Sequence, residues 1–158
     1  MLKLFSIFIT LLVFLMDTGV AAPYSKEKGQ FILPPFDMEI VLTDRAKQQL
    51  LDMGERVKIV YYFSYNIGVS EKKIGSASEK PREVFLPSTG GIASMKEWRI
   101  SERKRLSFEP YLLVNVVSAR DKCTHNLLNC EIYSGDYPKN DQPIRISCDV
   151  ISTPPFCH

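Results

Sequence analysis

Alternating apolar and polar positions recur along most of the chain and predict β-strands. In segment 36–42 every even-numbered residue is apolar, which is the pattern of a strand with one buried face. The odd-numbered positions of segment 56–65 are apolar and often β-branched or aromatic, so we expect a central strand there. Residues 111–119 are almost continuously apolar, as in a strand buried on both faces. Further strands are predicted at 83–86, 92–100, 129–134 and 144–151.

Between these strands the pattern predicts one short helix and several connections. Apolar residues recur at helical spacing from Ala46 to Met53, after Thr43 or Asp44 as a cap, and Gly54 supplies the stop. Polar residues, glycine and proline predict a long mobile loop over 66–81 and a second loop over 136–143. Six to eight strands with one helix predict a mainly β domain, either an antiparallel β-sandwich or an open barrel.

The first residues have the organisation of a secretion signal. A short basic start at Lys3 precedes an apolar run that ends at Met16, and small residues follow up to Ala22. The run is shorter than the ~20 residues of a membrane-spanning helix, although an uncleaved anchor remains the alternative. We therefore predict a signal peptide over 1–22, an extended leader over 23–35 and a single β-rich domain over 36–158. The product is expected to be periplasmic or secreted, with no stable membrane insertion after cleavage.

All four cysteines lie in the last third of the chain, at Cys123, Cys130, Cys148 and Cys157. In an exported protein an even number of cysteines predicts disulfide bonds. The alternative is a metal site that combines these sulfurs with His125 and His158, but the cysteines lack the close spacing of structural zinc sites. We therefore predict a disulfide-braced domain with no metal and no cofactor.

Strand register favours one of the three possible disulfide pairings. If the last two predicted strands pair antiparallel, Cys130 faces Cys148 and Ile132 faces Ile146. Nearly the same register brings Cys123 opposite Cys157, so two nested bridges are predicted. Each bridge would stabilise the fold by about 2–4 kcal/mol, mainly by restricting the unfolded chain.

The sequence contains none of the common catalytic motifs. It has no nucleophile elbow, no zinc-protease motif and no phosphate- or dinucleotide-binding glycine loop. Paired carboxylates are conceivable at Asp37 and Glu39, but alternation places both on the outward face of a strand. We therefore predict that the protein is not an enzyme.

One basic stretch could form a binding surface. Between Lys96 and Arg105, five basic residues and two acidic residues surround the only tryptophan. Such a surface would suit an acidic protein, an anionic glycan or a lipid headgroup. The alternative is a solvated strand end with the tryptophan turned into the core. The candidate binding residues are Trp98, Arg99, Arg103, Lys104 and Arg105.

The aromatic residues of the central strand have the same two interpretations. They could form a binding face, although their spacing is more typical of core packing. The residues are Tyr61, Tyr62, Phe63 and Tyr65.

Charge and motif content together favour recognition over catalysis. The net charge of +2 gives no reason to expect a nucleic acid partner. We expect an exported non-catalytic binding protein, in concrete form a periplasmic inhibitor or immunity-type protein that recognises an envelope or secreted protein. One alternative is a structural component that joins a cell-envelope complex through an exposed sheet edge. The other is an enzyme that acts on envelope polymers and uses Asp37, Glu39 or His125.

Overall fold

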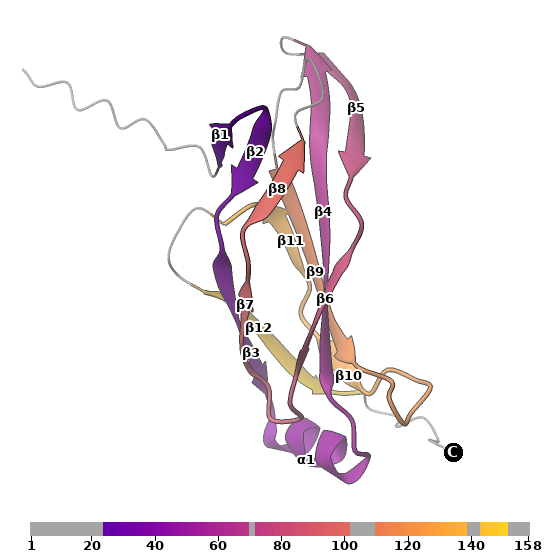
Figure 1. Cartoon of the computed structure of the whole chain (residues 1–158). Helices are drawn as coiled ribbons and strands as arrows, with labels where there is room; N and C mark the ends of the chain where they lie inside the picture. Colours follow the sequence, from indigo (N-terminus) through magenta and orange to yellow (C-terminus); the bar gives the residue numbers. More distant parts are fainter. Residues whose placement is uncertain (1–23, 70–71, 102–109, 139–142, 152–158) are drawn as a thin grey trace, which may run out of the picture.

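The computed structural model describes residues 24–69, 72–101, 110–138 and 143–151 (Figure 1). In this part of the chain the protein is mainly β, with three sheets and one helix in a sandwich-like arrangement, as the sequence predicted, although the described residues form twelve strands and not six to eight. The predicted signal peptide at 1–22 lies outside the described residues.

The elements follow one another in a nearly continuous series of short strands. The helix α1 spans Asp44–Asp52. The strands are β1 (Ser25–Glu27), β2 (Gln30–Leu33), β3 (Phe36–Leu42), β4 (Val57–Val69), β5 (Lys72–Ser78), β6 (Arg82–Leu86), β7 (Gly91–Met95), β8 (Trp98–Ser101), β9 (Pro110–Ser118), β10 (Leu128–Cys130), β11 (Tyr133–Asp136) and β12 (Ile144–Val150).

Two larger sheets and one small sheet share these strands. In the five-stranded sheet, β4 pairs with β9 along one edge and with β6 and then β5 along the other, while β11 pairs with β9. The four-stranded sheet has the order β10-β12-β3-β7, and its β12–β3 pair is parallel. The small sheet has the order β1-β2-β8. Helix α1 lies at one end of the molecule, and β1, β2 and β5 lie at the other end (Figure 1).

The predicted alternation accounts for the core between the sheets. The odd-numbered residues of β4 from Val57 to Phe63 are fully buried, as are the even-numbered residues Leu112 and Val114 of β9. Residues 111–119 are therefore not buried on both faces as predicted, because Tyr111 on the opposite face is 41% exposed. Along β3, Met38, Ile40 and Leu42 are buried on one side.

A cluster of aromatic rings connects the three sheets. Phe36 of β3 lies edge-on to Tyr61 of β4 at 6.4 Å between ring centroids and to Tyr137 at 5.3 Å. Phe63 of β4 contacts Trp98 of β8 at 5.2 Å and Tyr137 at 6.3 Å. The Phe63–Trp98 pair is tilted by 42°, and the other three pairs are edge-to-face, an arrangement that adds to the stabilisation from burial.

The helix begins and ends where the sequence predicted. The Thr43 side chain accepts a hydrogen bond from the Ala46 backbone N–H, and Gly54 follows with φ of 64°. Ala46 and Leu50 are buried, but Met53 is 37% exposed because it caps the helix instead of continuing its apolar face.

The prediction of a long loop over 66–81 is wrong. The strand β4 continues to Val69 and forms an antiparallel hairpin with β5. Polar and small residues offer the same backbone N–H and C=O groups as apolar ones, so they pair once a neighbouring strand is present. Part of the predicted leader also forms a hairpin, β1–β2, in which Phe31 and Leu33 join the core.

Two segments predicted as single strands are each divided between sheets. Segment 92–100 forms β7 in the four-stranded sheet and β8 in the small sheet. Segment 129–134 forms β10, which pairs with β12, and β11, which pairs with β9. A continuous apolar pattern does not reveal such a change of sheet, because both parts keep one buried face.

The predicted bridge between Cys130 and Cys148 is confirmed, and the two residues face each other in the β10–β12 register. The predicted pairing of Ile132 with Ile146 is wrong: the chain leaves β12 after Glu131, and Ile132 is 62% exposed. Cys123 is buried and disulfide-bonded, and its predicted partner Cys157 lies outside the described residues.

Two buried tyrosines give a first test of the core. The Tyr137 hydroxyl donates a hydrogen bond to the Pro34 carbonyl oxygen at 2.5 Å, whereas the Tyr61 hydroxyl has no partner within the described part of the chain. Burial raises the pKa of Tyr61 to about 12, so its hydroxyl stays protonated at neutral pH.

We expect Tyr61→Phe to leave the free energy of unfolding unchanged or raise it by up to about 1 kcal/mol, and Tyr137→Phe to lower it by about 1 kcal/mol. Denaturant titration measures both, and equal losses would contradict the assignment.

Candidate functional site

The basic surface predicted around Trp98 is only partly described. Trp98 is 3% exposed, so its ring belongs to the interior, in agreement with the alternative interpretation. Arg99 is exposed, and its Nε lies 2.6 Å from Glu97 Oε1. Residues 103–105 of the prediction lie outside the described residues. The aromatic part of the predicted surface is therefore wrong, because the indole packs in the core.

Exposed aromatic residues lie instead on the outer face of the five-stranded sheet. Because odd positions of β4 face the core, its even positions face outward, and directly paired residues share a face. Tyr62 of β4 is paired with Leu113, Lys58 is paired with both Phe85 and Val117, and Ser64 is paired with Tyr111. Tyr62, Phe85 and Tyr111 are each 41% exposed. The outer aromatic face consists of Tyr62, Phe85, Tyr111, Leu113 and Val117.

Two cations flank the ring of Phe85. The Arg56 guanidinium lies 4.7 Å from the ring centroid, and Lys58 Nζ lies 5.9 Å from it. Lys58 Nζ also lies 2.7 Å from Glu83 Oε1 on the same side of the sheet. One end of the outer aromatic face thus combines an exposed ring with two positive charges.

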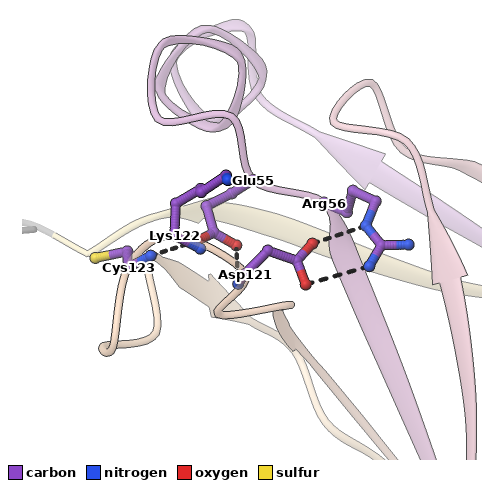
Figure 2. Close-up of polar contacts among 5 residues, drawn as sticks. All are labelled: Glu55, Arg56, Asp121, Lys122 and Cys123. Atoms are coloured by element: carbon purple, nitrogen blue, oxygen red, sulfur yellow. Dashed lines mark hydrogen bonds and ion pairs between the residues drawn. The ribbon is translucent and has the colours of Figure 1, made fainter.

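Arg56 is held in one orientation by Asp121. Its Nε and Nη2 donate to Asp121 Oδ2 and Oδ1 at 2.7 and 3.2 Å, a two-point ion pair drawn in Figure 2. The hydrogen bond from Arg56 holds the pKa of Asp121 below its ordinary value, and the same contact raises the pKa of Arg56. The guanidinium therefore stays charged and fixed between the carboxylate and the Phe85 ring.

The loop that carries Asp121 is fixed in turn by Glu55. This side chain is 2% exposed, and its carboxylate accepts three successive backbone N–H groups (Figure 2). Glu55 Oε2 is 3.0 Å from the nitrogen of Asp121, and Oε1 is 2.6 Å from the nitrogens of Lys122 and Cys123. A buried carboxylate needs such donors, so the loop is held against the start of β4. Sequence reasoning did not identify Glu55, since nothing local links it to residues far along the chain.

Further cations are exposed in the loop that carries Asp121, where Arg120 and Lys122 lie on either side of it in the sequence. The cations that contact the Phe85 ring, Arg56 and Lys58, are each paired with a carboxylate, Asp121 and Glu83.

A groove of about 500 Å³ lies on the opposite sheet, over the Cys130–Cys148 bridge. Both carboxylates of its lining are engaged within the protein. Asp149 accepts from Thr43 Oγ1 at 2.7 Å, which lowers the pKa of Asp149, and Glu131 accepts from the Ser147 N–H at 3.0 Å. The charged groups of the groove thus already have partners of their own.

The residues considered for catalysis do not form a catalytic arrangement with one another. Asp37 and His125 are exposed, and Glu39 lies opposite Arg145, whose Nε is 3.7 Å from its Oε2. Within the described ranges, no three His, Cys, Asp or Glu side chains gather closely enough to bind a metal ion. Helix α1, which is the helix of the described part of the chain, is too short and too polar to cross a membrane.

Comparison with known proteins adds no information on function. No family model matches the chain, and neither a curated protein nor a solved structure shows significant similarity to it.

Glu55 should be essential for local stability. We expect Glu55→Gln to lower the free energy of unfolding by about 1–3 kcal/mol, because buried N–H groups lose a charged acceptor. The matched control is Glu131→Gln, which changes an exposed carboxylate that accepts a single backbone N–H from Ser147. Urea titration should show a clearly smaller loss for the control, and equal losses would refute the role of Glu55.

The Arg56–Asp121 pair predicts a pH dependence. Because the folded-state pKa of Asp121 is lowered, its contribution to stability is present above its unfolded pKa and is lost as pH falls through the folded value. At neutral pH, Asp121→Asn should therefore be less stable than the wild type. The difference should shrink as pH falls below the ordinary value of 3.8. Thermal melts across this range test the sign, and a difference that grows with acidification would contradict it.

Proposed function

We propose that this chain is an exported, non-catalytic binding protein that recognises a protein partner through the outer aromatic face. Its concrete form is an inhibitor or immunity-type protein that blocks an envelope or secreted protein. The observation that carries the proposal is the exposure of Tyr62, Phe85 and Tyr111 on one sheet face beside the fixed Arg56. Folded monomers rarely expose large apolar side chains together unless these serve an interaction.

The composition of the face suits a protein partner. Tyrosine, phenylalanine and arginine are enriched where protein interfaces gain most of their binding energy. The aromatic side chains project from paired strands, and Arg56 is oriented by Asp121. Little conformational freedom would therefore be lost on binding, which favours affinity.

The charge of the site indicates what the partner presents. Arg120 and Lys122, exposed in the loop that holds Arg56, favour a partner surface with carboxylates beside its apolar part. Disulfide formation is compatible with the export that the proposal requires, since thiols oxidise outside the cytosol.

Assembly through a sheet edge is the second candidate and has less support. The edge formed by β5 and β6 is interrupted at Lys80 and Pro81, residue types that discourage strand addition. The edge strand β11 has only 4 residues. Among the described residues, no assembled group of side chains favours an enzymatic role.

The proposal is tested by capturing the partner with face variants. The immobilised mature protein should recover a stoichiometric protein from a cell-envelope extract, whereas Phe85→Ala and Tyr62→Ala should recover at least about tenfold less, as expected for central interface residues. Band intensity after elution measures the loss.

The control changes an exposed apolar residue of the other sheet. Ile92 of β7 is 64% exposed, and Ile92→Ala should capture as much partner as the wild type. All variants should have the same melting temperature as the wild type, which shows that they fold. Equal capture by all four proteins, or capture of nothing at any salt concentration, would count against the proposal.

A further inference from the structure

An exposed arginine at the edge of the sandwich lies on the buried tryptophan. The Arg82 guanidinium is 4.0 Å from the centre of the Trp98 ring. Arg82 belongs to the edge strand β6 and is paired with Tyr61, whose side chain is in the core. The arginine therefore extends from the five-stranded sheet to the β8 strand of the small sheet. Stacking of this kind fixes the plane of a guanidinium.

This guanidinium has no acidic partner among the described residues. The nearby Arg99 is paired with Glu97, and Glu83, the next residue of β6, is paired with Lys58. Arg56 also differs from Arg82, because the Nε and Nη2 groups of its guanidinium both donate to Asp121. As far as the described residues extend, the N–H groups of Arg82 are therefore open to an external acceptor.

We propose that Arg82 is an anchor for a carboxylate of the protein partner. One guanidinium can hold a carboxylate by two parallel hydrogen bonds, and its single charge balances that of one carboxylate. A phosphate carries more negative charge and would call for further cations in contact with it.

The anchor deepens the proposed function and rests on it for the source of the carboxylate. The strand β6 carries Phe85 on the outer aromatic face and Arg82 on its opposite side, at the sheet edge. A partner that covers the Phe85 end of the face and extends around the β6 edge would bring an acidic side chain to Arg82.

The single tryptophan makes the anchor directly observable. A carboxylate bound to Arg82 changes the charge next to the Trp98 ring and hence its fluorescence. We expect titration with a blocked oligoglutamate peptide to give a saturable change, and blocked oligolysine or sodium chloride at the same ionic strength to give none. A response to inorganic phosphate but not to oligoglutamate would overturn the proposal.

Two substitutions separate the guanidinium fork from its charge. Arg82→Gln should weaken the oligoglutamate response by about tenfold or more, because a charge-assisted pair is lost. Arg82→Lys keeps a cation over the indole but not the fork, and should bind more weakly than the wild type with an unchanged melting temperature. The control Arg99→Gln should respond like the wild type. Equal responses in all four proteins would refute the anchor.

Partner capture distinguishes failure of the anchor from failure of the proposed function. Reduced capture by both Arg82→Gln and Phe85→Ala supports the anchor as part of the interface. If only Phe85→Ala loses the partner, the proposed function stands and the anchor is wrong. If no partner is captured but the oligoglutamate response depends on Arg82, the carboxylate site stands and its assignment to a protein partner is wrong.

Discussion

The buried carboxylate of Glu55 imposes the constraint on which the rest of the site depends. An ionised group out of contact with water needs strong donors, and Glu55 finds them in three successive backbone N–H groups of a distant loop. That contact holds Asp121 beside Arg56, and Arg56 in turn lies against Phe85. One internal interaction thereby orients an exposed arginine and ring on the outer face.

The two arginines stacked on aromatic rings show how a similar contact can have different uses. Arg56 is neutralised by Asp121, so its role on the surface is to lie fixed against the Phe85 ring at the border of the aromatic face. Arg82 has the same kind of ring contact, with Trp98, but no carboxylate partner among the residues that the structure describes. The chemical difference between an occupied and an available guanidinium fork is what separates a structural contact from a proposed recognition contact.

Much of the fold was predictable because its signals are local. Period-two alternation correctly indicated β3 and the core face of β4, and the Thr43 cap and the Gly54 stop correctly bounded the helix. The Cys130–Cys148 bridge was predictable because it follows from the register of two adjacent strands. The loop prediction over 66–81 failed since polarity reports on burial, whereas strand pairing uses the backbone.

For β3, the core face of β4 and the helix, the sequence by itself determined which residues face inward and where the element begins, because those properties repeat over neighbouring residues. Only the tertiary structure decided which distant groups meet. Glu55 and the Asp121 amide are 66 positions apart, and Trp98 entered the core since β8 belongs to a different sheet from β7. Such contacts depend on the order of the strands and on which sheet each strand joins. The same periodic pattern of apolar residues is compatible with many different strand orders, so it does not determine these contacts.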